Sequence, residues 1–218
     1  HNASASLIID GKLVCSIAEE RLSRQKNHYG FPSLAIKCVL DTAGVSSKDI
    51  DRVAMSSKHL PPSYFYTSRN SKLSIKDYWK EQTEYWFPKI YENKHPKYLD
   101  VLSHRVDRNN FPYDESLIEH EGDNEGMWNA RVQYLAKTLD IDESIISHHD
   151  HHMCHAYYGY IACPNRNNPL LVYTMDGFGD GANGTVSIAK PGEPLNEISR
   201  SSNCNIGRMY RYATLLLG

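Results

Sequence analysis

Five of the eleven histidines fall between positions 148 and 155, and Asp176 follows the last of them after an apolar run. His151 and His155 are four residues apart, so on a helix their imidazoles share one face and can reach one ion. His152 is rotated by about 100° from His151 and is predicted to support the ligands or contact a substrate. Two imidazoles and one carboxylate leave coordination positions open, a pattern typical of Fe²⁺ or another divalent metal ion in an enzyme.

The surrounding elements must bring the aspartate to the histidines. Residues 151–163 are predicted to form a helix, and 144–147 a short strand that leads into the cluster. The apolar run 169–175 is predicted to be a strand covered on both faces, with 185–190 as its hairpin partner. A second interpretation stays open, because histidine clusters on protein surfaces often bind nothing.

Three glycines, Gly177, Gly179 and Gly181, follow the aspartate. Glycines let the backbone approach a ligand closely, and exposed N–H groups form a nest for anions. We therefore expect these residues to bind the anionic part of a cofactor. A flexible turn is the alternative, because the spacing matches neither a P-loop nor a dinucleotide-binding fingerprint.

The beginning of the chain is predicted to form a hairpin, because apolar runs flank Asp10–Gly11, a two-residue turn signal. The charged stretch 19–26 follows, and its charge density alone favours a solvated loop or helix face. The next predicted elements are a helix with Ser33 as N-cap and Gly44 as its stop, and a strand over 51–56.

The region from His59 to Gly126 is rich in aromatic and charged residues. A helix over 74–93, broken near Pro88, and a further helix over 127–139 are predicted. The aromatic rings suit stacking on bases or sugars, but their large surfaces favour the packed inner face of a helical insertion.

Composition argues against several partner classes. A net charge of −2 gives no attraction to nucleic acid or to an anionic membrane. No apolar run approaches the roughly 20 residues of a membrane span. The five scattered cysteines, without a C-x-x-C pair, favour free thiols in the cytoplasm. There is no signal peptide, and both ends look cut, so we expect a fragment of a longer cytoplasmic protein.

Five stretches of the chain, taken in order, resemble the O-carbamoyltransferases of the nodulation and antibiotic-tailoring type. They are His1-Asn2-Ala3-Ser4-Ala5, Glu19 to Lys26 with Phe31-Pro32, His151 to Ala156, Asp176-Gly177, and Gly207-Arg208-Met209-Tyr210. The amino-terminal domain of that family is similar to the Kae1-like proteins, which have the actin–sugar kinase–Hsp70 fold.

The resemblance implies an α/β fold with a ribonuclease H-like mixed sheet and flanking helices. Residues 1–165 are then the first half, with the helical insertion at 59–126, and 166–218 begin the duplicated second half. It also implies a reaction in which carbamoyl phosphate and ATP give a carbamoyl-adenylate in a separate carboxy-terminal domain. The carbamoyl group then passes to a hydroxyl of a small molecule, such as a sugar or an antibiotic.

Matching positions carry roles over from the family. His151, His155 and Asp176 match the ligands of a divalent metal ion, iron in some members, with a further acidic ligand beyond Gly218. His1 matches a catalytic histidine, a candidate general base for the acceptor hydroxyl, and Lys26 matches a lysine that contacts the carbamoyl-adenylate. Two positions depart from the family pattern: Asn2, next to His1, replaces an aspartate, and Asn205, near Gly207, replaces a serine.

Three other functions compete with this one. A threonylcarbamoyl-transfer protein acting on tRNA shares the fold and the two-histidine site, but the stretch Glu19 to Lys26 and the absence of excess basic charge argue against it. A metal-binding module without catalytic activity is the second. A metal-dependent hydrolase is the third, supported by the histidines alone.

Overall fold

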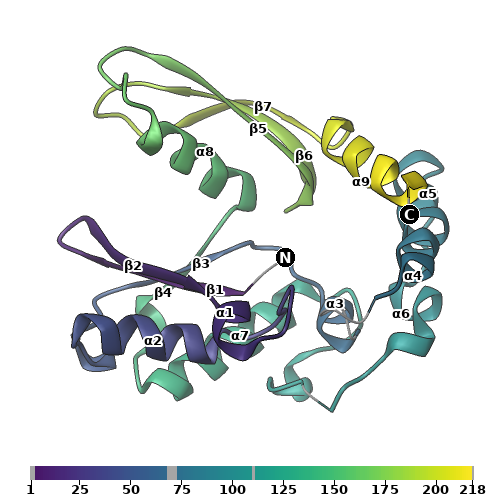
Figure 1. Cartoon of the computed structure of the whole chain (residues 1–218), viewed down its shortest axis with the longest axis horizontal. Coiled ribbons are helices and arrows are strands. Elements are labelled where there is room, and N and C mark those ends of the chain that lie inside the picture. Colours follow the sequence, from purple (N-terminus) through teal and green to yellow (C-terminus); the bar gives the residue numbers. More distant parts are fainter. Residues whose placement is uncertain (1–2, 68–72, 110, 218) are drawn as a thin grey trace. The chain divides into compact units, whose positions relative to one another are not determined.

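The computed structural model describes residues 3–67, 73–109 and 111–217, which form a mixed α/β structure (Figure 1). The chain divides into two compact units. The first unit comprises His1–Arg52 and Pro61–Ile145, and the second comprises Val53–Leu60 and Ile146–Gly218. The division into a first half over 1–165 and a duplicated second half from 166 stays a prediction.

The first unit contains the predicted hairpin. Strand β1 (Ser4–Ile9) pairs antiparallel with β2 (Lys12–Ala18). Asp10 and Gly11 connect them with φ angles of 49° and 73°. A two-residue hairpin turn requires this left-handed conformation, which glycine adopts freely and aspartate tolerates.

Two helices follow the hairpin, α1 (Glu19–Ser23) and α2 (Ser33–Ala43). Gly44 ends α2 as predicted, with φ of 66° and its N–H bonded to carbonyl groups of the last turn. The short 3₁₀-helix η1 (Ser47–Asp49) follows α2, and another, η5 (Glu143–Ile145), follows the aromatic-rich region.

The start of α2 corrects one prediction. Ser33 is the first helical residue and not the N-cap. The N–H groups of Leu34 and Ala35 instead donate to the carboxylate of Glu19, at 3.1 and 2.7 Å. Glu19 is 2 % exposed. Its burial is compatible with its charge because its carboxylate accepts from N–H groups of the first turn, which have no acceptor within the helix. The charged stretch therefore begins with a buried residue.

Helices make up much of the described aromatic-rich region. They are α3 (Pro62–Tyr66), α4 (Ile75–Lys80), the π-helix η2 (Glu81–Trp86), α5 (Phe87–Tyr91), α6 (Tyr98–Val101), η3 (Ser103–Arg105) and η4 (Glu115–Leu117). The predicted break near Pro88 is wrong, since α4, η2 and α5 follow one another without interruption. Pro88 lies in the first turn of α5, directly after the π-helical segment, where a missing N–H is tolerated.

The aromatic side chains of this region pack against one another. Tyr113 is buried with Met127, and the rings of Phe65 and Tyr134 lie edge-on to Tyr113 at 5.5 and 5.3 Å between centroids. This geometry is favourable for aromatic pairs, and it confirms the packed interpretation for these rings. Helix α7 (Asn124–Leu139) supplies Met127 and Tyr134 and begins three residues earlier than predicted.

The second unit contains the histidine cluster. Strand β3 (Val53–Ser56) pairs in parallel with β4 (Ile146–His149), which lies two residues later than predicted. Helix α8 (His151–Ala162) follows, as the sequence predicts. It begins there because the carboxylate of Asp150 accepts the N–H of Met153 at 2.9 Å, an N-cap bond.

A three-stranded antiparallel sheet completes the core of this unit. Its strands lie in the order β5 (Leu170–Gly179), β6 (Ala182–Ala189) and β7 (Asn196–Ser201). Helix α8 lies along one face of the sheet, where Ala156 packs on Val172 (Figure 1). The prediction that β5 is covered on both faces is wrong. Its side chains alternate between the two faces of the sheet, and α8 packs on one face within the described residues: Val172 and Thr174 are buried, whereas Leu171, Tyr173 and Met175 are exposed.

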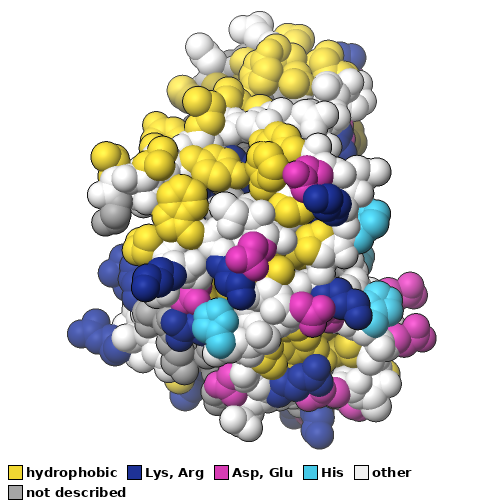
Figure 2. All heavy atoms as spheres, turned by 90° about the vertical axis from the view of Figure 1, so that its right-hand side faces the viewer, with side chains coloured by type: hydrophobic (Ala, Val, Ile, Leu, Met, Phe, Trp, Pro, Cys, Tyr) yellow, Lys and Arg dark blue, Asp and Glu magenta, His cyan; other side chains and the backbone are white. Residues whose placement is uncertain are grey.

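Helix α9 (Ile206–Leu217) begins at β5. A Cβ atom on Gly207 would lie 2.6 Å from the carbonyl carbon of Asp176, so only glycine lets the first turn approach the strand this closely. Met209, Tyr210 and Leu216 are exposed on α9, and Figure 2 shows hydrophobic side chains gathered on the face where this helix lies. Among the described residues, no helix combines the length and the apolar character that crossing a bilayer demands.

Candidate metal centre

Two residues of α8 and one of β5 bring three donor atoms together. His155 Nε2 lies 3.2 Å from His151 Nε2 and 3.5 Å from Asp176 Oδ2. His151 Nε2 contacts the same carboxylate oxygen, and all three donor atoms lie within 4.8 Å of one another. The helical spacing and the strand end therefore bring the three side chains together, as the sequence predicts.

These separations fit a shared divalent ion. Metal–ligand bonds of about 2.0–2.2 Å put neighbouring nitrogen and oxygen ligands about 3 Å apart. The side chains of His151, His155 and Asp176 are 27, 55 and 35 % exposed, so a further ligand has access from solvent. Two imidazoles with one carboxylate suit iron, zinc or a similar ion.

The electrostatic environment favours the protonation states that bind a metal. The hydrogen bond from His151 holds the pKa of Asp176 well below its usual range, although burial opposes this, and the Gly177 N–H adds to the effect. Burial lowers the pKa of His155, and the neighbouring His151 lowers it further. An ionised carboxylate and a neutral imidazole are the forms that act as ligands.

The packing and the backbone conformation beside Asp176 account for Gly179 and Gly181 without a ligand. A Cβ atom on Gly179 would lie 2.2 Å from Cδ2 of His151, so the imidazole lies directly against the strand backbone. Gly181, with φ of 78°, forms the turn between β5 and β6. The N–H of Gly177 donates to the carboxylate of Asp176. The expected contact of these three glycines with a cofactor stays a prediction.

His152 supports α8 from behind. It is fully buried, with Nδ1 2.7 Å from Thr174 Oγ1 and Nε2 3.1 Å from the carbonyl oxygen of Ala182. A carbonyl only accepts, so Nε2 carries a proton and donates it to Ala182, while Nδ1 shares a hydrogen bond with the threonine hydroxyl. His152 therefore fixes the ligand-bearing helix on β5 and β6, and its ring faces no solvent from which a substrate could approach.

Sequence reasoning missed Asp180, the other residue of the β5–β6 turn. Its side chain is buried, yet the surrounding donors keep its pKa below the usual value. Burial opposes ionisation, but the N–H groups of Lys58, His59 and His151 and the hydroxyl of Ser57 outweigh it. The Asp-Gly turn signal is visible in the sequence, whereas these partners come from distant segments.

Lys26 lies in the first unit. Its Nζ donates to both carboxylate oxygens of Glu20, at 2.9 and 3.2 Å, and this bond lowers the pKa of Glu20. Glu20 and Lys26 line a hollow of about 230 Å³ together with Arg21 and Arg24. Three cations beside one carboxylate leave excess positive charge there, which suits an anionic ligand.

His1 and Asn2 lie outside the described residues. The described residue nearest to them, Ala3, donates its N–H to the carbonyl oxygen of His28 at 2.9 Å, and its own carbonyl accepts the N–H of Glu19. The backbone that follows His1 thus runs beside the segment that follows Lys26.

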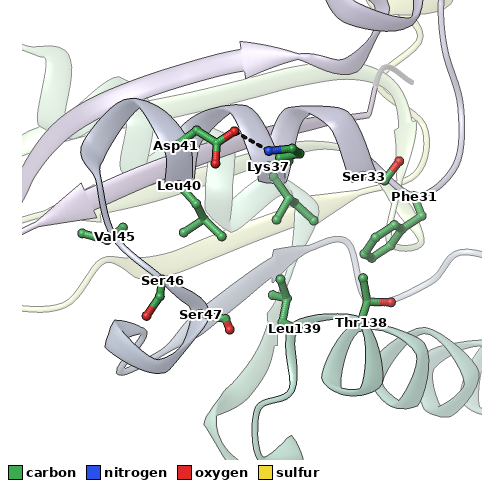
Figure 3. Close-up of a pocket in the computed structure, with 11 residues that line it drawn as sticks. Phe31, Ser33, Lys37, Leu40, Asp41, Val45, Ser46, Ser47, Thr138 and Leu139 are labelled. Atoms are coloured by element: carbon green, nitrogen blue, oxygen red, sulfur yellow. Dashed lines mark hydrogen bonds and ion pairs between the residues drawn. The ribbon is translucent and has the colours of Figure 1, made fainter.

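A larger hollow, of about 340 Å³, lies between α2 and the end of α7 (Figure 3). Phe31, Leu40 and Leu139 line it, and Lys37 and Asp41 form an ion pair of 2.6 Å at its border. Both charges of this pair are exposed, and no residue predicted to act in catalysis or binding lines the hollow. Its size alone does not make it the active site.

Comparison with known proteins assigns the family. A family model described as "Carbamoyltransferase N-terminus" matches residues 1–218. The chain therefore belongs to the carbamoyltransferase amino-terminal family, as the five stretches predict.

Individual relatives are more distant. The chain is 24% identical over its whole length to Nodulation protein NolNO of Sinorhizobium fredii, covering 25% of that protein. It is 37% identical over 28% of its length to the uncharacterized protein sll1178 of a Synechocystis strain, covering 10% of it. A 19.2 kDa uncharacterized protein of Rhizobium etli is 39% identical over 25% of the chain, which covers 32% of it. The chain thus spans between a tenth and a third of the curated relatives it matches.

Proposed function

We propose that this chain forms part of an O-carbamoyltransferase that transfers a carbamoyl group from carbamoyl-adenylate to a hydroxyl of a small molecule. The observation that carries the proposal is the convergence of His151, His155 and Asp176 in a chain of the carbamoyltransferase family. The mixed α/β elements and the two Asp-Gly hairpins are consistent with the duplicated actin–sugar kinase–Hsp70 fold that the resemblance implies, and we propose that fold for the whole protein.

The donor set fits a divalent metal ion, which we propose to be Fe²⁺. His151 and His155 would hold it from α8 and Asp176 from β5, with a further ligand from outside these residues. Such an ion acts as a Lewis acid toward a bound carbonyl or phosphate oxygen. The protein supports it by keeping Asp176 ionised and by fixing both imidazoles on one helix whose far side is locked by His152.

Protein groups account for the remaining steps. The acceptor oxygen forms a bond to the carbamoyl carbon, the bond from that carbon to the phosphate oxygen breaks, and AMP leaves. We assign the hydroxyl proton to His1 as general base, because a neutral imidazole accepts a proton near pH 7. Lys26 is assigned to the negative charge of the adenylate; the cationic hollow that it shares with Arg21 and Arg24 supports this role.

The donor side of the reaction is proposed for the complete protein. ATP and carbamoyl phosphate would react in a carboxy-terminal adenylate-forming domain, and this segment would receive the product. The acceptor class, a sugar-like or antibiotic-like hydroxyl compound, follows the resemblance alone.

A transfer assay tests the proposal. Full-length protein is incubated with ATP, labelled carbamoyl phosphate and either a panel of hexoses and glycosides or total tRNA, and products are identified by mass spectrometry. We expect a carbamoylated sugar and AMP. Labelling of tRNA alone would favour the threonylcarbamoyl-transfer alternative, and no transfer to any acceptor, with metal still bound, would favour a non-catalytic module.

A single variant tests the role of His1 as general base. His1→Ala is expected to stop transfer while carbamoyl-adenylate still forms, because the base acts only on the acceptor. His95→Ala, which removes an exposed histidine of the first unit, is the control and should behave as wild type. Loss of adenylate formation in His1→Ala would contradict the assignment.

A further inference from the structure

One carboxylate in the second unit joins three separate segments of the chain. Asp180 Oδ1 accepts the hydroxyl of Ser57 at 3.0 Å and the N–H of His59 at 2.7 Å. Its Oδ2 accepts the N–H of Lys58 at 2.8 Å and the N–H of His151 at 2.7 Å. Asp180 is 8 % exposed. The turn between β5 and β6, the segment after β3 and the first residue of α8 are thereby held at a single point.

The bond to α8 ends on a proposed metal ligand. The first N–H groups of a helix have no acceptor within the helix. Asp150 satisfies the N–H of Met153 from within the same turn, whereas the N–H of His151 is satisfied from the sheet by Asp180. Asp180 also lies four residues after Asp176, in the turn that directly follows the same strand. The backbone that carries one ligand is therefore bonded directly to the hairpin that carries another.

The turn itself does not require a buried carboxylate. Asp10 occupies the same position in the β1–β2 turn, with φ of 49° against 48° for Asp180, and glycine follows in both cases. Asp10 is exposed. Aspartate is favoured at both places because it tolerates positive φ, so the burial of Asp180 and its four hydrogen bonds need a different reason.

We propose that Asp180 is a positioning residue for the metal centre: it fixes the start of α8 on the β5–β6 hairpin, so that His151 and Asp176 stay at the separation one ion requires. The inference rests on the proposed metal site. Asp180 is not itself a ligand, because each of its oxygens already accepts two hydrogen bonds. Residues that hold ligands from behind commonly change metal affinity by about 10- to 100-fold when they are replaced.

The test compares Asp180→Asn with Asp10→Asn in full-length apoprotein. Asparagine keeps the turn, since it also tolerates positive φ, but its single oxygen accepts for only half of the four donors. Zn²⁺ affinity is measured by competition with a chromophoric chelator, and unfolding by urea is followed in parallel. Asp180→Asn should bind Zn²⁺ about 10- to 100-fold more weakly, and Asp10→Asn should bind as wild type does.

Ser57→Ala separates positioning from general stability. It removes a hydrogen bond to Oδ1 of Asp180, whereas the N–H of His151 donates to Oδ2. We expect it to lower the urea midpoint while Zn²⁺ affinity stays within about twofold of wild type. If affinity falls in proportion to stability in both Ser57→Ala and Asp180→Asn, Asp180 is merely structural and the inference is overturned. Should Asp180→Asn fail to fold, Asp180→Glu replaces it, because it keeps the charge and displaces both oxygens.

The two proposals fail in different ways. If His155→Ala binds Zn²⁺ as tightly as wild type, the metal site itself is wrongly assigned. If His155→Ala loses binding while Asp180→Asn keeps full affinity, the metal site stands and only the positioning role is overturned.

Discussion

The β1–β2 hairpin of the first unit and the β5–β6 hairpin of the second turn on the same pair of residue types, Asp10–Gly11 and Asp180–Gly181, with nearly equal φ angles. The first carboxylate faces solvent, and the second is buried and bonded to two other segments of the chain. Local sequence therefore determines the turn. The packing around the turn determines whether its carboxylate forms hydrogen bonds with other segments of the chain.

Both units nevertheless place a buried carboxylate at the start of a helix. In the first unit this is Glu19, directly after β2, which accepts from the first turn of α2. In the second it is Asp180, at the hairpin tip, which accepts from the first residue of α8. The shared cause is the unsatisfied N–H groups of a helix start. The difference is that only the second helix carries metal-ligand candidates.

Among variants that leave the three proposed ligands in place, Gly179→Ala is expected to have the largest effect, because its new Cβ lies against the ring of a ligand on the second hairpin. The new Cβ would overlap the imidazole of His151, 2.2 Å from Cδ2, and displace it from Asp176. Metal affinity of the apoprotein should fall about 100-fold or more. Gly159→Ala in α8 is the control, since the nearest atom to its new Cβ, Val172 Cγ1, lies at an ordinary 3.8 Å. Equal affinities of the two variants would contradict the close packing of ring and strand.

Glu19→Gln tests the first unit in the same way. One of its two carboxylate acceptors is replaced by an N–H₂ group, so an N–H of α2 loses its acceptor, and the free energy of unfolding should fall by about 2 kcal/mol. Metal affinity, measured by chelator competition on the folded protein, should not change. A loss of metal affinity in Glu19→Gln would contradict the view that Glu19 stabilises the first unit alone while Asp180 acts on the metal centre.

Asp77 adds a carboxylate whose charge is already balanced. It accepts from Ser74, from His104 at 2.6 Å and from Arg105 at 2.7 Å. Burial opposes its ionisation, but the bonds from Arg105, Ser74 and His104 outweigh it and hold its pKa well below the usual range. The guanidinium of Arg105 already neutralises this carboxylate, and Arg105 and His104 occupy its oxygens. We therefore interpret the cluster of Asp77, His104 and Arg105 as a structural ion pair and not as a metal site.

The pH dependence of Asp77→Asn follows from the lowered pKa. The folded-state pKa lies below the unfolded value of about 3.9, so the contribution of Asp77 is complete above about pH 5 and is lost as pH falls toward the folded-state pKa. Wild type should be about 1 kcal/mol more stable than Asp77→Asn at pH 7, and the difference should shrink below about pH 4. Urea unfolding at several pH values measures it; a difference that grows on acidification would contradict the sign.

The sequence predicts the local features of the site. Helical spacing selects His151 and His155, and the apolar strand before Asp176 places the carboxylate at a strand end. Asp-Gly and Gly44 predict turns and stops, because these depend on backbone conformations that few residues adopt. The family resemblance, confirmed by the match over residues 1–218, depends on several short stretches in order.

Other features depend on partners that are distant along the chain. Asp180 binds residues 121 to 123 positions earlier, and Glu19 replaces Ser33 as the acceptor at the start of α2 from 15 positions away. The exposed face of β5 is not predictable from its sequence, because a continuous apolar run does not reveal which face a helix covers. Position 179 requires glycine because the ring of His151 lies against the strand there. No local sequence pattern predicts this contact.

Metal content per chain is the most direct test of the central claim that His151, His155 and Asp176 form one divalent-metal site. Full-length wild type, His155→Ala and the control His149→Ala, whose ring lies beside Ser147 on β4, are loaded with Fe²⁺ without oxygen, desalted and measured by elemental analysis. We expect one ion per chain in wild type and in His149→Ala, and none in His155→Ala. Equal metal content in all three proteins would contradict the account.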